Sequence, residues 1–498
     1  MNPIVLTGHT LTAEQFQAVV CHRVPVSISS CAQKRLEDSR KLLYDLADSG
    51  ISIYGLNVGV GWNKDEAVPE EHYATYNRQL IYSHCIGLPP WAKEEDVRAA
   101  LLTRLNIMLV GSASPDPKIP AFYADLLNHG IHPLIPTQGS VGQADIGLMS
   151  FVGLTILGEG QVYYKGEITD AAVALAAEGL SPLKNLGPKD GLSIVSTNAL
   201  GLGQGLLVLQ ELEDLLKAAD LIYCAALEAL NGNVSPFDVK ALHLKGDEGI
   251  LETGASMRSH LENSYLYSPD EARPLQDPLC YRNAVHIHGA VREMLQYTRE
   301  RMIRAINAGE DNPSLVLEEK RILPTANFEP INWVLGVEAL AVSLSHVAHA
   351  AGHRIVKLAN PNFTGLDRFL APENVLGFAT IQKLFAANFA KIRHLSTPTS
   401  MDSFALAGEI EDKATNAPYC VQRVREMLDA LREILALELL HAAQGTDYRL
   451  KAGKVLGKDT ARLHKKVRSV VPFLDEDRVL AHDLLALCDL LIKGDLVE

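Results

Sequence analysis

Apolar residues recur at helical spacing through the last two thirds of the chain. In residues 331–347, and again in residues 421–439, they return every three or four positions, the pattern of a helix with one buried face. Each patterned helix extends for roughly 25 to 30 residues, or about 40 Å. Rods of this length bury their apolar faces against one another in a bundle. We therefore expect a mainly α protein built around an elongated central helical bundle.

The first third of the chain is interrupted by loops more often than the rest. Prolines are frequent between residues 89 and 136, and glycines cluster near Tyr54 and Gly139, a composition typical of loops. Residues 162–168 place β-formers on both sides of a Lys-Gly turn, which predicts a short hairpin. We expect residues 1–190 to form a loop-rich, mainly helical region and residues 191–498 to form the bundle and C-terminal helices, together making a single structural unit.

Residues 191–210 contain no charged side chain over about the length that spans a bilayer. They also include several hydroxyl and amide side chains and four glycines, which is too polar for a helix facing lipid. We interpret this stretch as a helix buried on all sides within a large helical assembly.

Composition limits the class of protein further. The 498 residues carry a formal net charge of −14, which argues against nucleic acid or an anionic membrane as a partner. The seven cysteines are dispersed, with no Cys-x-x-Cys pair, as expected for free thiols in a reducing compartment. The first ten residues lack the pattern of a secretory signal. We expect a cytoplasmic protein.

Three segments carry candidate chemistry: Tyr54–Gly61, Gly139–Asp145 and Gln276–Arg282. In this order and at these distances they resemble the aromatic amino-acid ammonia-lyases and aminomutases, the histidine ammonia-lyase family. Further colinear blocks near both ends of the chain extend the resemblance over its whole length. It implies a histidine ammonia-lyase-like fold of the fumarase/aspartase type, and a homotetramer whose four active sites are each built from three subunits.

The middle segment departs from the family where the family does its chemistry. There, Gly-Ser-Val-Gly is followed by Ala-Ser-Gly-Asp, and the Ala-Ser-Gly tripeptide cyclises into an electrophilic methylidene-imidazolone (MIO) group. In this chain Gly142 is followed by Gln143, Ala144 and Asp145, one residue short, with neither the serine nor the glycine. We therefore expect no MIO group and no other cofactor.

The resemblance implies a role for individual residues. Tyr54 stands at the position of the catalytic base, and Glu411 at a position suited to the substrate amine or to a second proton transfer. The implied substrate-binding positions are His84, Ser196, Asn198, Gln276, Arg282, Asn327 and Phe328. Among them, Arg282 corresponds to the arginine that binds the substrate carboxylate with its two-pronged guanidinium.

Each of these residues also has a purely structural interpretation. Tyr54 could pack a turn, and an unperturbed phenol is only about 0.1% ionised at pH 7. Arg282 could pair internally with Glu411 or Asp277, and His84 could be an ordinary structural histidine. Gln276 and Asp277 could organise their own loop.

Other departures surround the missing electrophile. The family's Asn-Gly-Thr becomes Ser196-Thr197-Asn198, and a family tyrosine becomes Leu279. Two family histidines become Glu329 and Lys413. A site that no longer builds MIO has no use for groups that serve it, so these changes look coordinated.

A separate pattern places His346, His349 and His353 on one face of an expected helix. Spacings of three and four residues could hold a divalent metal ion. Because the helix belongs to the expected bundle, packing between subunits is the favoured interpretation.

These observations predict a MIO-independent lyase, isomerase or cyclase that acts on an amino acid or an amino-acid-derived carboxylate. Without MIO, a base can act only where the substrate supplies its own activation, such as a better leaving group. The main alternative is a catalytically silent paralogue that binds a ligand or a partner subunit. An ordinary amino-acid ammonia-lyase and a metal-dependent enzyme using the three histidines are lesser alternatives.

Overall fold

The computed structural model describes residues 2–494 and 496. The chain forms two compact units, each assembled from three segments. Unit 1 comprises Met1–Val208, Thr298–Leu335 and Pro398–Gln422, and unit 2 comprises Leu209–Tyr297, Gly336–Thr397 and Arg423–Glu498. Four long helices pass from one unit into the other: α9 (Ala199–Leu230), α13 (Ala284–Ile306), α14 (Ile331–Leu358) and α17 (Ala417–Lys451).

Unit 1 is built around a helix that is buried along most of its length. The helices that lie wholly in this unit are α1 (Ala13–Val20), α2 (Ser30–Asp48), α3 (Tyr73–His84), α4 (Glu94–Met108), α5 (Lys118–His129), α6 (Ile146–Leu157), α7 (Ala171–Ala177) and α8 (Asp190–Val195). Helix α4 is buried from Asp96 to Met108 and packs against α1 and α5. Helix α6 packs against α3 and α8, and this group of three supports the candidate site.

The strands of unit 1 are short and form small separate sheets. They are β1 (Ile4–Leu6), β2 (Val26–Ile28), β3 (Leu88–Trp91), β4 (Ile131–Pro133), β5 (Pro136–Gln138), β6 (Gln161–Tyr164), β7 (Glu167–Asp170), β8 (Ser314–Val316) and β9 (Arg321–Leu323). The predicted hairpin is confirmed: β6 and β7 pair antiparallel around Lys165 and Gly166, both with positive φ, as such a tight turn requires. The other pairs are β1 with β2, β3 with β5, β4 with β6, and β8 with β9.

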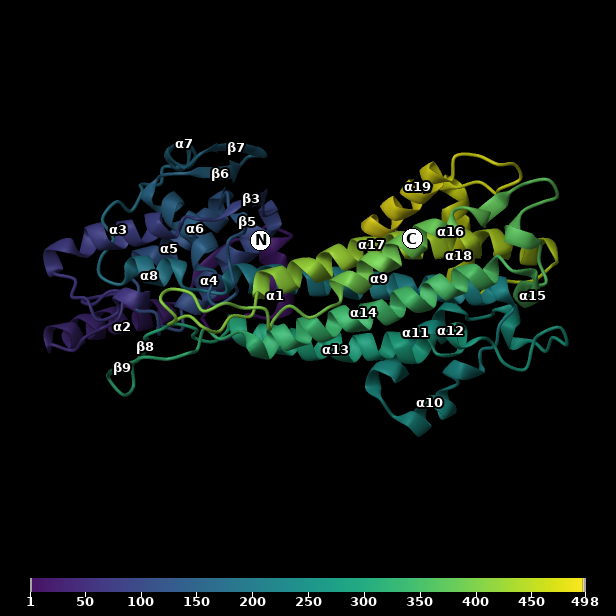
Figure 1. Cartoon of the computed structure of the whole chain (residues 1–498), viewed down its shortest axis with the longest axis horizontal. Helices are drawn as coiled ribbons and strands as arrows, with labels where there is room; N and C mark the ends of the chain where they lie inside the picture. Colours follow the sequence, from purple (N-terminus) through teal and green to yellow (C-terminus); the bar gives the residue numbers. More distant parts are fainter. Residues whose placement is uncertain (1, 495, 497–498) are drawn as a thin grey trace. The chain divides into compact units, whose positions relative to one another are not determined.

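Unit 2 is helical (Figure 1). Besides its parts of the four long helices it contains α10 (Val239–Lys245), α11 (Glu248–His260), α12 (Leu279–Arg282), α15 (Pro361–Thr364), α16 (Gln382–Leu395), α18 (Lys458–Val470) and α19 (Leu480–Lys493). Buried ion pairs join the long helices. Arg354 of α14 pairs with Glu438 of α17, and Asp220 of α9 contacts His288 of α13 at 2.7 Å.

The predicted long helices are confirmed, and their apolar faces are buried as expected. On α17, all eight residues of the pattern between Val421 and Leu439 are buried. On α14 the pattern is buried from Val337 to Val347, but Leu335 is 55% exposed. Leu335 therefore does not belong to the buried face of this chain.

The sequence predicted one continuous helix over residues 191–210, and this prediction is wrong in one respect, because the helix is interrupted. Helix α8 ends at Val195 and α9 begins at Ala199, so Ser196, Thr197 and Asn198 are not helical. The cause is tertiary, since polar groups of Thr197 and Asn198 bond to other segments, as described below. The apolar window of Asp190–Leu230 is wholly buried within the protein, as expected for a core helix. A second helix long and apolar enough to span a membrane, Ile331–Leu358, is 67% buried in its apolar window, which is weak evidence for a membrane span.

Candidate functional site

Unit 1 encloses a cavity of about 850 Å³. Its walls come from the loop after α2, from α3, from the altered loop before α6, from the end of α8, and from the loops around Phe328 and Glu411. The lining residues that the sequence singled out are Tyr54, His84, Gln143, Ala144, Ser196, Phe328 and Glu411. Segments distant in sequence therefore meet at one cavity.

Tyr54 presents its phenol to this cavity. The Tyr54 hydroxyl oxygen accepts a hydrogen bond from the backbone N–H of Gly61 at 2.7 Å. Burial raises the pKa of Tyr54 above its ordinary value, the Gly61 N–H lowers it in part, and the carboxylate of Glu411 raises it further. The neighbouring Gly55 has a φ of +74°, and a Cβ there would lie 2.5 Å from a methyl carbon of Leu192, so only glycine fits beside the phenol.

Glu411, another residue of the cavity lining, lies at the end of a tight turn. The backbone groups of Leu406 and Glu411 exchange two hydrogen bonds, with N···O distances of 2.9 and 3.2 Å. Gly408, at the tip of this turn, packs on the indole of Trp62, where any Cβ would overlap the ring. The turn thereby places the Glu411 carboxylate close enough to Tyr54 to act on its pKa.

The altered loop is tied to the protein through its backbone. The Ala144 N–H donates to Oδ1 of Asn198 at 3.1 Å, and the Asp145 N–H donates to the carbonyl oxygen of Thr197 at 2.7 Å. Ala144 has a φ of +56°, a conformation uncommon for a residue other than glycine. A Cβ on Gly142 would lie 2.1 Å from the backbone nitrogen of Ala417, so the loop lies directly against the start of α17.

The side chain of Gln143 is engaged as well. Its amide nitrogen donates to Oε2 of Glu329 at 2.9 Å, and Oε1 of Glu329 accepts from the Ile331 N–H at the start of α14. Gln143 and Glu329 both stand where the family has other residues, and the structure shows that they contact each other. The two departures are therefore coupled.

Asp145 is completely buried behind the loop. Its carboxylate accepts from the Ser140 hydroxyl at 2.8 Å and from the Gly201 N–H at 3.1 Å. Burial raises its pKa from 3.8 to about 7, with Glu310 a smaller contributor in the same direction, while the two hydrogen bonds lower it. Near neutral pH this carboxyl is therefore close to its point of half-ionisation.

Asn198 and Asn327 have places different from the substrate-binding roles that the resemblance implied. The amide nitrogen of Asn198 donates to the carbonyl oxygen of Phe328 at 2.6 Å, and its oxygen holds Ala144. Asn327 donates to the Ser314 hydroxyl at 3.5 Å, and neither asparagine lines the cavity. Asn198 is only 3% exposed and supports the wall from behind, whereas Ser196 lines the cavity itself.

His84 lines the cavity with a defined tautomer. Its Nδ1 lies 2.7 Å from the carbonyl oxygen of Leu80. A carbonyl oxygen can only accept, so Nδ1 carries the proton in the neutral ring and Nε2 keeps its lone pair. His84 can therefore offer an acceptor to a ligand.

Arg282 and Gln276 belong to unit 2 and do not line the cavity. A guanidinium nitrogen of Arg282 donates to the side-chain oxygen of Gln276 at 2.7 Å. Asp277 organises its own loop, since its carboxylate accepts from the backbone and side-chain nitrogens of Asn233 at 2.6 and 3.1 Å. Within the described part of the chain, no carboxylate forms an ion pair with Arg282, so the predicted internal pair with Glu411 or Asp277 is not formed.

The three histidines of α14 are exposed on one face, as predicted. Only two of them touch: Nε2 of His353 lies 3.1 Å from Nε2 of His349. Among residues 2–494 and 496, no group of three or more His, Cys, Asp or Glu side chains is placed to hold a metal ion. The metal alternative therefore gains no support from His346, His349 and His353.

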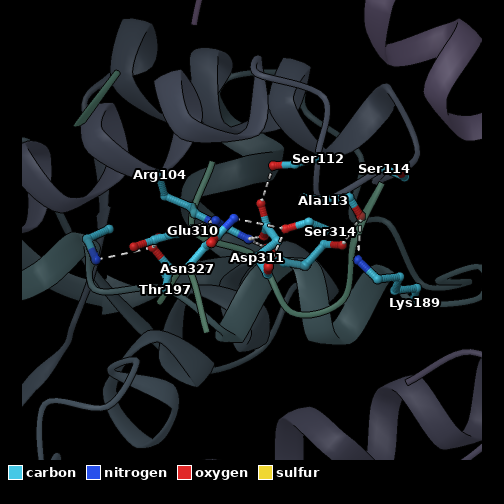
Figure 2. A network of polar contacts seen from close by, with 12 residues as sticks. Arg104, Ser112, Ala113, Ser114, Lys189, Thr197, Glu310, Asp311, Ser314 and Asn327 are labelled. Carbon is cyan, nitrogen blue, oxygen red and sulfur yellow. Dashed lines mark hydrogen bonds and ion pairs between the residues drawn. The ribbon is translucent and has the colours of Figure 1, made fainter. Parts of the chain in front are cut away.

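The buried charges behind the altered loop could not be predicted from sequence motifs. Figure 2 shows Arg104, Glu310 and Asp311 at the centre of a polar network that reaches Thr197 on one side and Lys189 on the other. Arg104 is fully buried, and its partners lie 206 and 207 residues away along the chain. No motif in the sequence connects them.

The sequence matches the aromatic amino acid lyase family over residues 11–469. It is 30% identical to a histidine ammonia-lyase of Treponema denticola, covering 100% of this chain and 98% of that protein. The structure is similar to that of the ergothioneine-degrading enzyme ergothionase of Treponema denticola, solved with desmethyl-ergothioneine sulfonic acid, with a TM-score of 0.97, 40% identity and full coverage of both chains. It is also similar to tyrosine aminomutase of Streptomyces globisporus, with a TM-score of 0.92, 28% identity, and 99% and 98% of the two chains covered. The chain therefore belongs to the aromatic amino acid lyase family.

Proposed function

We propose that this protein is a MIO-independent lyase that eliminates a tertiary amine from the quaternary ammonium betaine of an imidazole amino acid, with ergothioneine as the substrate to test. One observation carries the proposal. The cavity keeps the phenol of Tyr54 and the carboxylate of Glu411, while the loop that should supply the electrophile holds Gln143 and Ala144. Such a site retains a base but has no means of activating a primary amine.

The residues at the loop do not fit an MIO group. Formation of MIO requires a nitrogen to attack a carbonyl and a serine to lose water, and neither a serine nor a glycine follows Gln143. In addition, the Ala144 N–H is bonded to Asn198 and the Gln143 amide to Glu329. We therefore assign no step of the reaction to an electrophilic cofactor.

Ergothioneine supplies the activation that the loop lacks. It is the trimethylammonium betaine of a histidine that carries sulfur on its ring, so its amine is already a cationic leaving group. Loss of the proton on the carbon beside the ring, with formation of a carbon–carbon double bond, sends the bonding electrons to nitrogen and releases neutral trimethylamine. No electrophile is required to make nitrogen leave. The likeness to ergothionase supports this choice of substrate.

The walls of the cavity suit a quaternary ammonium group. The rings of Tyr54, Trp62, Tyr76 and Phe328 line it, and Glu411 is the one carboxylate among its described lining residues. Aromatic faces and a carboxylate attract such a cation. Two lysines also line the cavity, but Lys64 pairs with Asp65 and Lys413 donates to the Ala414 carbonyl oxygen.

Tyr54 acts as the base in this proposal. Its raised pKa keeps the phenol protonated in the empty site, and a bound trimethylammonium group favours the phenolate because opposite charges attract. Among the described residues, none accepts a hydrogen bond from the Tyr54 hydroxyl, so its proton passes to water when the phenolate forms, and the phenolate then takes the substrate proton. Binding of the cationic substrate thereby converts Tyr54 into the phenolate base.

Arg282 binds the substrate carboxylate from a second copy of the chain, in a homotetramer that shares its active sites. Among the described residues, the guanidinium forms no ion pair with a carboxylate and donates to the neutral Gln276, so it can bind an anion. We place the enzyme in the cytoplasm, with neither nucleic acid nor membrane as a partner.

The proposal is tested by incubating purified protein with ergothioneine, histidine, phenylalanine and tyrosine, and measuring trimethylamine and ammonia separately. We expect trimethylamine and an unsaturated thioimidazole acid from ergothioneine, and negligible ammonia from the three amino acids. Release of ammonia from histidine at a comparable rate would assign the protein to ordinary ammonia-lyases. No product from any substrate would favour the catalytically silent paralogue.

A further inference from the structure

Arg104, Glu310 and Asp311 form a buried charged network (Figure 2), which is linked to the altered loop through Asn198. The guanidinium of Arg104 lies 2.9 Å from Oδ1 of Asp311 and 3.4 Å from Oε1 of Glu310. Glu310 is 6% exposed and Asp311 is 3% exposed. Removing such charges from water is costly, so a buried network of this kind needs an explanation beyond stability.

The carboxylate of Glu310 is surrounded by donors. One oxygen accepts from Arg104 and from the Thr197 hydroxyl. The other accepts from the backbone N–H of Asn198 at 3.2 Å and from its side-chain amide nitrogen at 3.4 Å. Three of the four donors therefore belong to the break between α8 and α9, and Glu310 fixes that break in position.

The fixed segment in turn holds two parts of the cavity wall. The oxygen of the Asn198 side chain accepts from the Ala144 N–H, and its nitrogen donates to the Phe328 carbonyl oxygen. The carbonyl oxygen of Thr197 accepts from the Asp145 N–H. Because these bonds orient both ends of the Asn198 amide, a small rotation at Asn198 would move Ala144 and Phe328 together.

We propose that Glu310 is a positioning residue for the cavity, acting through Thr197 and Asn198 on Ala144 and Phe328. Arg104 holds the carboxylate in place, and the carboxylate holds the helix break. The break then fixes the altered loop in its left-handed conformation at Ala144 and fixes Phe328 against the ligand. The kinetic test of this inference rests on the proposed function, whereas the hydrogen-exchange test does not.

Glu310→Gln tests the proposal at nearly constant volume. A carboxylate accepts at both oxygens, whereas an amide has one oxygen and one NH₂ group. Whichever way the new amide turns, its NH₂ group faces two of the four donors. We therefore expect the Thr197–Asn198 segment to shift and the backbone amides of Ala144 and Asp145 to lose protection.

The first measurement is hydrogen exchange of peptides that cover residues 140–150, compared with the rest of unit 1. Glu310→Gln should raise exchange in these peptides about tenfold or more. Asp190→Asn is the matched control, because Asp190 also forms a buried pair, with Arg40 at 3.1 Å, and does not contact Asn198. The control should leave the relative exchange of residues 140–150 unchanged. Equal effects of the two variants would overturn the proposal.

The second measurement is the ratio of kcat/KM for ergothioneine to kcat/KM for the sulfur-free trimethylbetaine of histidine. A ratio taken on one preparation does not depend on the fraction of folded enzyme. Glu310→Gln should change this ratio about threefold or more, and Asp190→Asn should not. If the wild-type protein releases trimethylamine from neither betaine, the proposed function fails, while the exchange result still decides the role of Glu310.

Thr197→Val provides a second route should Glu310→Gln not fold. It removes the hydroxyl that donates to Glu310 and leaves every buried charge in place. It should reproduce the increased exchange at residues 140–150 to a smaller extent. Unchanged exchange in Thr197→Val, together with wild-type exchange or an unfolded chain in Glu310→Gln, would contradict the proposal.

Discussion

Two loops of unit 1 face the same cavity and differ in what their polar groups do. In the loop Tyr54–Gly61, the phenol accepts one hydrogen bond from Gly61 and keeps its own proton available. In the loop Gly139–Asp145, the Gln143 amide nitrogen is bonded to Glu329, the Ala144 N–H to Asn198, and the Asp145 carboxylate to Ser140 and Gly201, whereas the buried Oε1 of Gln143 has no hydrogen-bond partner among the described residues. The first loop presents an ionisable phenol to the cavity, and the second is held in place mainly as part of its wall.

In the proposed function the site has lost its electrophile, and the contacts of the altered loop explain how it keeps its shape. Gln143 and Ala144 make hydrogen bonds to Glu329 and Asn198, which also differ from the family pattern, and these bonds hold the loop in place. The proposed base, Tyr54, is useful to any substrate that brings its own leaving group.

The largest effect is expected on the reactive loop. Tyr54→Phe keeps the ring and removes the group that takes the proton, so turnover of ergothioneine should fall about 10²- to 10⁴-fold. Binding of desmethyl-ergothioneine sulfonic acid, measured by calorimetry, should change little. Wild-type turnover in this variant would refute the assignment of Tyr54 as the base.

Arg282→Lys tests the proposed carboxylate anchor. A lysine keeps the charge but cannot make the two parallel hydrogen bonds of a guanidinium. We expect KM for ergothioneine to rise roughly tenfold to a hundredfold, with a smaller change in kcat. Steady-state kinetics measure both constants, and an unchanged KM would remove Arg282 from the site.

The pH dependence of the reaction follows from the raised pKa of Tyr54. Below that pKa the phenolate fraction increases tenfold with each pH unit, so kcat/KM should keep rising up to at least about pH 9. The cationic substrate lowers the pKa in the complex, so kcat should level off at a lower pH than kcat/KM. A flat kcat/KM profile across this range would contradict the proposed base.

The smallest effect concerns the structural loop. The pKa of Asp145 is about 7 in the folded protein and 3.8 in the reference state, so between these values the folded state binds more protons. The contribution of Asp145 to stability is therefore present at low pH and is lost as pH rises toward 7, by at most about 1.4 kcal/mol per pH unit. Asp145→Asn should flatten the dependence of the unfolding midpoint on pH between 4 and 7. An unchanged dependence would show that Asp145 titrates normally.

Sequence patterns predicted much of the fold because the signals were local or repeated. The apolar faces of α14 and α17 follow directly from residues three and four positions apart, and the hairpin of β6 and β7 follows from its turn. The break at residues 196–198 could not be predicted in this way. Its cause is hydrogen bonding to Glu310 and Asp145, which lie far away in the sequence, and nothing in the apolar run itself marks it.

The residues of the candidate site also differ in whether the sequence could predict their place. Residues carried over from family motifs, such as Tyr54, His84 and Glu411, line one cavity in the structure. Asn198 was assigned to the substrate by position, whereas its amide supports the wall. The contact between Gln143 and Glu329 joins residues 186 positions apart, so only the fold could show that the two substitutions belong together.

The proposed function requires that the altered loop carries no electrophile in the protein that performs the reaction. This requirement is checked by intact-mass spectrometry of the preparation that releases trimethylamine from ergothioneine, followed by peptide mapping around Gly142. We expect the mass of the unmodified chain, with Gln143 and Ala144 recovered as ordinary residues. A mass deficit corresponding to two waters, mapped to that peptide, would contradict it.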